Sequence, residues 1–176
     1  MNNKEFDVRN NNLMKTVSLY GSINDNKEIW MKWYKSCKDY IEGLGLKANY
    51  FSIESATMKT GKVMTMNKSE KKMSKSIEQG DKINWLSIYS LPDNFKQAAF
   101  DYDVYMTRGR GHVCFSASKD IYKRIVENDF INLFKQFIEF ESGEVFEMAR
   151  EESSIFYMFR ANSESDYETL KLIKKF

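Results

Sequence analysis

The sequence predicts an α+β (or α/β) domain, in which a central mixed β-sheet of about five or six strands is flanked by two main helices. Three patterns predict this class. The chain opens with a strand, an amphipathic helix and a second strand within residues 14–53. Residues 98–116 alternate as an antiparallel hairpin, and residues 120–138 repeat apolar side chains at helical spacing.

The opening of the chain carries the first three predicted elements. Residues 14–20 alternate apolar and polar side chains, which is typical of a strand. In residues 28–42 apolar side chains recur three and four positions apart, which predicts a helix with an aromatic face. Gly43 ends this helix, and residues 46–53 follow as the second strand.

The middle of the chain combines loops, a helix and a strand. Residues 57–67 are predicted as either an exposed hairpin or a loop. Residues 68–79 have the pattern of a short helix. Residues 83–91 are predicted as a strand, which Pro92 stops.

The clearest hairpin joins residues 100–106 to residues 113–115. Its turn is Arg108-Gly109-Arg110-Gly111, and glycine accepts the positive φ that a tight turn requires. Two arginines on one turn are also compatible with a clamp for a phosphate or a carboxylate. A solvated hairpin tip is the simpler interpretation.

The C-terminal third is predicted to contain two helices and two short strands. The apolar spacing in residues 120–138 predicts the longest helix of the chain. The short apolar runs at residues 145–148 and 155–159 are predicted as strands. Residues 166–176 are predicted as a final helix, with lysines near its C-terminal end.

Length and composition limit the kind of protein. With 176 residues, a single domain over residues 14–176 is expected after a flexible polar arm at residues 1–13. The N-terminus lacks the apolar stretch of a signal peptide, and no apolar run reaches the ~18 residues of a membrane helix. Cys37 and Cys114 lie far apart and are interpreted as reduced thiols, which favours a cytoplasmic protein.

Reactive side chains are scarce, whereas bulky apolar ones are abundant. The chain has 1 His and 2 Cys but 13 Phe, 10 Tyr, 10 Met and 3 Trp. This is more than one sheet-and-helix core needs, so some are expected at the surface, where protein interfaces favour them. Composition therefore favours binding over catalysis, and no cofactor or metal is expected.

A small enzyme centred on His112 is one alternative. Histidine is the usual general base near neutral pH, and this one follows a glycine-rich turn. Asp101 and Asp103 on the facing strand are candidates to orient its ring. Cys114 lies two residues further on, on the same strand face, where a Cys–His pair is conceivable.

A nucleic-acid-binding protein is another alternative. Residues 58–82 hold seven Lys against three acidic residues, a local surplus of four positive charges. The net charge of the chain is only +2, however, and His112 and Cys114 stand where RNA-recognition domains carry base-stacking aromatics. A solvated helix face with Met73 and Ile77 inward explains the lysines equally well.

The strongest charge feature is acidic. Residues 139–152 contain six glutamates against Arg150 alone, a surplus of five negative charges. Such a segment suits a surface that binds a cationic protein partner, although a solvated strand edge or a glycosidase-like carboxylate pair is also compatible with it. The predicted partner-binding residues are Asp101, Asp103, Glu139, Glu141, Glu144, Glu147, Glu151 and Glu152.

The chain resembles the immunity proteins of bacterial polymorphic-toxin and contact-dependent growth-inhibition systems. The similarity lies in size, a Lys/Asn-rich composition, the acidic segment and aromatic stretches such as Trp85-Leu86-Ser87-Ile88-Tyr89 and Phe100-Asp101-Tyr102-Asp103. It covers residues 14–160 without a shared motif, so no functional residue is carried over. The resemblance implies a cytoplasmic inhibitor that binds a cognate toxin domain, often a nuclease, and blocks its active site or its access to substrate.

Overall fold

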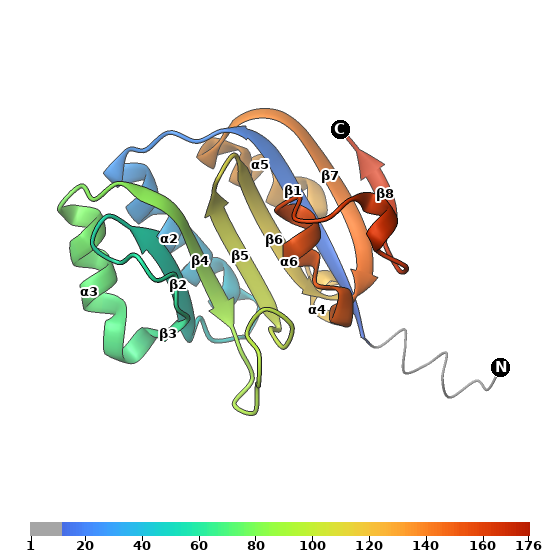
Figure 1. Ribbon diagram of the computed structural model, residues 1–176, viewed down its shortest axis with the longest axis horizontal. Coiled ribbons are helices and arrows are strands. Elements are labelled where there is room, and N and C mark those ends of the chain that lie inside the picture. Colours follow the sequence, from blue (N-terminus) through green and yellow to red (C-terminus); the bar gives the residue numbers. More distant parts are fainter. Residues whose placement is uncertain (1–11) are drawn as a thin grey trace.

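An open sheet of eight antiparallel strands organises the chain in a computed structural model that describes residues 12–176 (Figure 1). Residues 1–11, most of the predicted polar arm, lie outside the described residues. The strands are β1 (Leu13–Ser22), β2 (Tyr50–Ser55), β3 (Met64–Thr65), β4 (Ile83–Ser90), β5 (Val104–Gly109), β6 (His112–Ser118), β7 (Glu139–Ala149) and β8 (Lys171–Lys175). Their order across the sheet is β3-β2-β4-β5-β6-β1-β7-β8.

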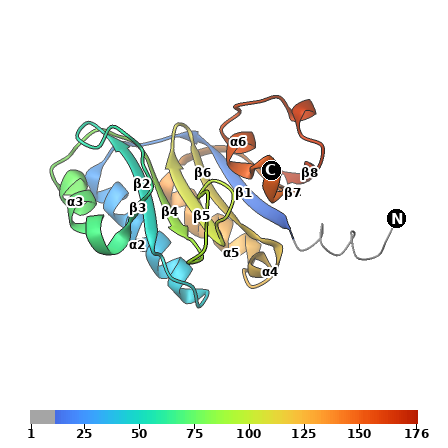
Figure 2. The same cartoon turned by 60° about the horizontal axis from the view of Figure 1, so that its bottom comes forward.

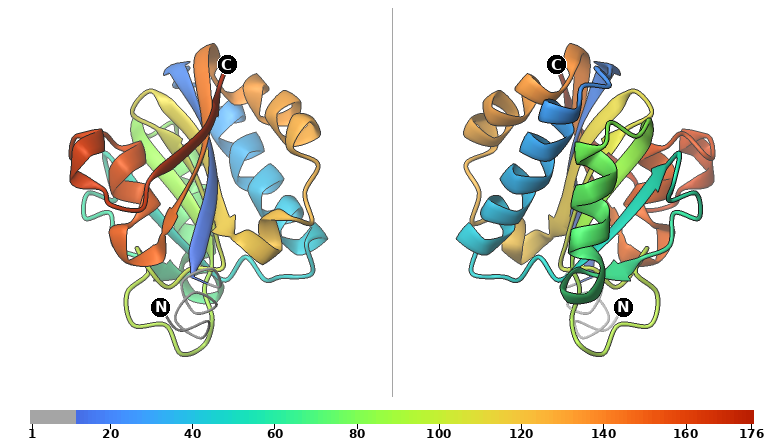
Figure 3. Two further views of the ribbon diagram at one scale, coloured as in Figure 1. Left: turned by 90° about the vertical axis from the view of Figure 1, so that its right-hand side faces the viewer. Right: turned by 90° about the vertical axis from the view of Figure 1, so that its left-hand side faces the viewer.

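Helical segments lie on both sides of this sheet. They are α2 (Lys27–Gly43), α3 (Met66–Glu78), α4 (Lys119–Tyr122), α5 (Glu127–Phe134) and α6 (Ser154–Met158), with short 3₁₀ turns η1 (Lys135–Phe137), η2 (Arg150–Glu152) and η3 (Glu164–Asp166). Helices α2, α3 and α5 pack on one side, called the helix face, and α6 lies on the other, called the α6 face (Figure 3). Figure 2 shows α6 beside β1 and β7.

Helix α2 forms where the apolar spacing predicts it. The Asn26 side chain caps its start, because Oδ1 accepts the backbone N–H of Glu28 at 2.8 Å. The buried side chains of the helix follow the predicted spacing of three and four. They are Trp30, Trp33, Tyr34, Cys37 and Ile41.

Aromatic rings fill the core on the helix face. The Trp33 ring lies 5.6 Å from Phe134 and 5.3 Å from Phe137, both edge-on, and its Nε1 donates to the Leu86 carbonyl oxygen at 3.1 Å. Tyr40 bridges the sheet and α5 through edge-on contacts with Phe115 and Phe130. These contacts fix α2 and α5 side by side on the sheet.

A second core lies under α6 and contains hydroxyl groups as well as apolar groups. Thr16 Oγ1 donates to Ser116 Oγ at 2.8 Å, and the Tyr102 hydroxyl lies 2.6 Å from Ser154 Oγ on α6. Because both sheet faces are covered, two cores bury most of the bulky side chains. Within residues 12–176 Phe156 and Phe176 are the only exposed aromatics, so little of the expected surplus reaches the surface.

The α+β class is confirmed, but the mixed sheet of five or six strands is wrong. All eight strands are antiparallel, and the edges are the two-residue β3 and the five-residue β8. Strand β8 replaces the helix predicted for residues 166–176. Its backbone pairs with β7, in a register that sets Lys175 opposite Glu144 and Lys171 opposite Glu147, and this long-range strand pairing outweighs local helix propensity.

Two further predictions for the C-terminal third are wrong. The long helix at residues 120–138 is broken into α4, α5 and η1, because Val126 is extended and the acidic residues Glu127 and Asp129 favour a new helix start. Residues 155–159 lie mostly in α6 instead of a strand. A short apolar run is compatible with either element, and here it is a helix with Phe156 outward.

The hairpin predicted between residues 100–106 and 113–115 is confirmed as β5 and β6. Gly109 pairs with His112, and the two turn residues, Arg110 and Gly111, have φ of 51° and 79°. This left-handed pair matches the twist of the flanking strands.

We expect Phe134→Ala to lower the free energy of unfolding by about 3–5 kcal/mol, because the ring is fully buried among Trp33, Phe130 and Phe137. The neighbouring Leu133→Ala is the control, since that side chain is 43% exposed, and it is expected to change stability by less than about 1 kcal/mol. Urea unfolding measures both. Equal losses at the two positions would contradict the described orientation of α5.

Candidate functional site

The acidic segment of residues 139–152 does not form one surface. Eleven of its residues lie in β7, and a strand advances about 3.3 Å per residue, so its ends are roughly 30 Å apart. Glu139 and Glu141 are exposed at the start of β7. Glu151 and Glu152 follow its end, beyond Ala149.

Glu144 is buried and engaged inside the molecule. It is 2% exposed, and its Oε1 accepts a hydrogen bond from the Tyr20 hydroxyl at 2.7 Å. The Tyr157 hydroxyl lies 3.5 Å from Oε2, and Arg160 Nη2 lies 3.3 Å from Oε1. The prediction that Glu144 contacts a partner is therefore wrong, because the pleat of β7 places this carboxylate under α6.

Glu147 faces the opposite side of the sheet from Glu144. Its Oε2 lies 3.3 Å from Lys119 Nζ, and its side chain is 13% exposed. This ion pair neutralises the carboxylate on the helix face. Glu147 therefore lies apart from the exposed glutamates at both ends of β7.

Four of the predicted carboxylates come together at one end of the sheet, where β4 and β7 end and β1 begins (Figure 1). The link is Arg150, whose Nη1 donates to the carbonyl oxygens of Phe100 at 2.7 Å and Tyr102 at 2.6 Å. These bonds hold the loop between β4 and β5 against η2. We call this surface the acidic end; its carboxylates are Asp101, Asp103, Glu151, Glu152 and Glu168.

Glu168 is the member of the acidic end that the sequence pattern misses. Glu152 Oε2 accepts the backbone N–H of Thr169 at 3.0 Å, which places Glu168 beside Glu151 and Glu152 around a hollow of ≈ 340 Å³. The sequence predicts residues 166–176 as a helix, and a helix there gives no reason to group Glu168 with Glu151 and Glu152. A second hollow, of ≈ 390 Å³, is lined by Asp101, Asp103 and Arg150.

The two aspartates of the acidic end differ in their electrostatics. Asp101 Oδ2 accepts the backbone N–H groups of Gln97 and Lys96, both at 2.8 Å, and these bonds lower the pKa of Asp101. Burial raises the pKa of Asp103, against the opposing effect of Arg150. Asp101 thus stabilises the turn at residues 96–101 through these hydrogen bonds and also carries a negative charge.

His112 and Cys114 are both buried on the α6 face. The His112 ring is 2% exposed and lies 4.7 Å edge-on from Phe159, and its Nε2 has no hydrogen-bond partner among the described residues. Burial lowers the pKa of His112 to about 4 and raises the pKa of the Cys114 thiol. A buried neutral thiol is a poor nucleophile, so this pair lacks the chemistry of a Cys–His site.

Asp101 and Asp103 do not lie near the His112 ring. Strand β5 runs away from Asp103 to Gly109, which pairs with His112, so the aspartates are at the opposite end of the hairpin. The expected role of these aspartates in orienting His112 is therefore wrong. Within residues 12–176, no three His, Cys, Asp or Glu side chains are grouped so as to hold a metal ion.

The two arginines of the hairpin turn diverge and form no clamp. Arg108 is buried under the helix face, where its Nε donates to the Phe137 carbonyl oxygen at 2.8 Å and its guanidinium stacks on Trp30 at 4.1 Å. Arg110 is exposed and pairs with Glu54 at 3.0 Å. The predicted clamp needs both guanidinium groups on one side, but Arg110 lies beyond the end of β5, in the turn, with φ of 51°, and its side chain reaches Glu54 instead.

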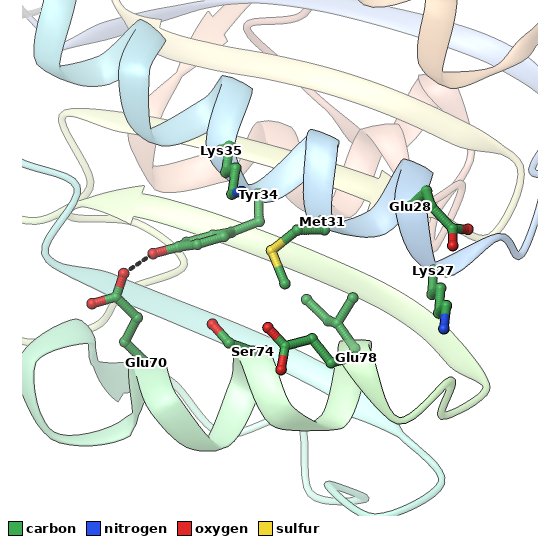
Figure 4. Close-up of a pocket in the computed structure, with 9 residues that line it drawn as sticks. Lys27, Glu28, Met31, Tyr34, Lys35, Glu70, Ser74 and Glu78 are labelled. Carbon is green, nitrogen blue, oxygen red and sulfur yellow. Dashed lines mark hydrogen bonds between the residues drawn. The ribbon is translucent and has the colours of Figure 1, made fainter.

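The lysines of residues 58–82 lie mainly on the outer side of α3. Met73 and Ile77 face inward and are buried, as the solvated-face interpretation predicts. A hollow of ≈ 540 Å³ separates α3 from α2, and Figure 4 shows Tyr34 donating to the Glu70 carboxylate across it. The charges that line it are mixed, because both Glu28 and Glu78 accompany its lysines.

Comparison with known proteins assigns no function to the chain, so a functional proposal has to come from its fold and these surfaces. No protein-family model matches the sequence, and no curated protein or solved structure is significantly similar to it. Among the helices of residues 12–176, none combines the length and apolar character needed to cross a membrane.

Replacing Glu144 is expected to affect stability. Glu144→Ala leaves the Tyr20 and Tyr157 hydroxyls without their acceptor, which costs about 1–3 kcal/mol. Thermal unfolding measures the loss, with the exposed Glu141→Ala as the matched control on the same strand. Two variants of equal stability would contradict the buried position of Glu144.

His112 is expected to make stability depend on pH. Its pKa is about 4 in the folded chain and 6.5 when exposed, so the unfolded state takes up the proton first as the pH falls. The wild type should therefore lose up to about 3 kcal/mol from this group between pH 6.5 and 4, whereas His112→Gln should lose less over this range. Urea unfolding at several pH values measures this. Parallel curves for the two proteins would exclude a buried neutral imidazole.

Proposed function

We propose that this protein binds and neutralises a protein toxin, and that the acidic end is the surface that contacts a cationic region of that toxin. This is the role of an immunity protein. The contact would block the active site of the toxin or the access of its substrate. A nuclease domain fits this description, because a cleft that binds a nucleic-acid backbone is cationic.

The observation that supports this proposal is the composition of the acidic end. Five carboxylates from three separate segments meet there against two cationic side chains, Lys96 and Arg150, and Arg150 directs its Nη1 to backbone carbonyl oxygens. A surface with a net excess of one sign of charge speeds the encounter with an oppositely charged partner and helps to orient it.

The positions of His112 and Cys114 favour binding over catalysis. The single imidazole and both thiols are buried, and burial shifts the pKa of each group toward its neutral form. Nucleic-acid binding through α3 has less support, because α3 contains no aromatic side chain on which a base could stack.

Charge reversal at the acidic end tests the proposal. The partner is the product of the gene immediately upstream, measured by calorimetry and by the rate of association. The double change Glu151→Lys and Glu168→Lys is expected to weaken binding by about tenfold or more, mainly through slower association. Raising the salt concentration should slow association of the wild type in the same way.

The chain supplies its own control at the other end of β7. Glu139→Lys with Glu141→Lys makes the same change in net charge roughly 30 Å away, and it should alter the affinity by less than about twofold. Absence of binding by the wild type would remove the proposed function. Equal weakening by both double variants would show a general effect of net charge and would remove the acidic end as the contact surface.

A further inference from the structure

We propose that the groove between α2 and α5 binds an amphipathic helix of a partner protein, one that carries an apolar stripe flanked by Lys or Arg. This α2–α5 groove has a volume of ≈ 560 Å³. Its lining residues are Ser36, Asp39, Tyr40, Gly43, Leu44, Arg124, Ile125, Val126, Asp129, Phe130 and Leu133. The inference is carried by a different surface from the acidic end and does not depend on it.

The groove has a firm aromatic floor. Tyr40 of α2 meets Phe130 of α5 at 5.4 Å, edge-on, and Phe130 stacks on Phe134 at 4.3 Å. Both helices rest on the same sheet face, so they form two parallel walls (Figure 3). The floor therefore exists before any partner binds, and little reorganisation opposes docking.

Apolar side chains are exposed along the α5 wall. Val126 is 65% exposed and Leu133 is 43% exposed, and Val126 is the most exposed large apolar side chain of the described residues. Val126 directly precedes α5 and Leu133 lies in its last turn, so the two stand at opposite ends of a helix roughly 12 Å long. Exposed apolar groups beside a half-buried floor are typical of a docking groove.

Acidic groups line both walls of the groove. Asp39 stands on α2 and Asp129 on α5, both are exposed, and neither takes part in an ion pair among residues 12–176. Asp129 acts on the floor directly, because it adds to the effect of burial that raises the pKa of Tyr40 to about 12. Arg124 directs its Nη1 to the Leu44 carbonyl oxygen at 3.3 Å.

These features identify the occupant. Two helices on a sheet present ridges between which a third helix packs at 8–10 Å, and apolar side chains at i, i+3, i+4 and i+7 match a groove two turns long. Carboxylates on both walls select Lys or Arg on both flanks of that helix. A second copy of this chain docked through the same groove would bring four carboxylates together with only two Arg124 side chains, so it lacks the surplus of positive charge that the groove favours.

Selection from a display library of helical 18-residue peptides, with the intact chain as the target, tests the inference. The recovered peptides are expected to carry a spaced apolar stripe with Lys or Arg on both sides. Their affinity is expected to fall at least tenfold for Leu133→Lys combined with Val126→Lys. Both side chains are exposed, so the variant should keep its fold, which its melting temperature verifies.

The matched control is Phe156→Lys, an exposed apolar position on α6 at the other sheet face. This change should leave peptide affinity unchanged. The Glu151→Lys and Glu168→Lys double variant should also leave it unchanged, so the test of the α2–α5 groove is independent of the test of the acidic end. Recovery of no peptide, of peptides with acidic flanks, or of peptides that bind the groove variant as tightly as the wild type would overturn the inference. Dimerisation of the free chain that Leu133→Lys abolishes would also overturn it.

Discussion

The pairing of β1 with β6 on one side and β7 on the other is the interaction on which the rest of the structure depends. All ten residues of β1 pair with β7, from Leu13 opposite Ala149 to Ser22 opposite Glu139. This register decides which side chains of β7 face the helices and which face α6. It places Glu144 against the Tyr20 hydroxyl on the α6 face and Glu147 beside Lys119 on the helix face. The carboxylates left for a partner are those at the start of β7 and those beyond its C-terminal end.

Both proposed contact surfaces lie outside the strands for the same reason. The interior of this sheet is covered on its two faces, so its side chains are committed to the cores. Loops and helix walls have no such constraint, and they bring together residues that share no sequence spacing. The acidic end joins residue 101 to residue 168, and the α2–α5 groove joins residue 39 to residue 129. For both surfaces we propose a cationic partner.

Strong local patterns predict individual elements of the fold, whereas long-range strand pairing cannot be predicted from them. Helix α2 and the β5–β6 hairpin follow local rules, namely spacing, capping and turn glycines. Strand β8 depends on backbone pairing with β7, a long-range contact that no local pattern records. The acidic segment correctly indicated Glu151 and Glu152 as exposed or partly exposed charges. It could not show that the pleat buries Glu144, nor that Glu168 lies beside Glu151.

The two edge strands of the sheet differ in length, and this difference affects the tendency of the chain to associate at high concentration. Strand β3 offers a neighbour only two residues, whereas β8 offers five, with Leu172 and Ile173 more than 40% exposed. The lysines of β8 repel another β8, and the register shift of β8 against β7 makes its outline irregular. Salt screens that repulsion but leaves the apolar side chains unchanged. Strand β8 is thus the place where crowding and high ionic strength together would begin self-assembly of the chain.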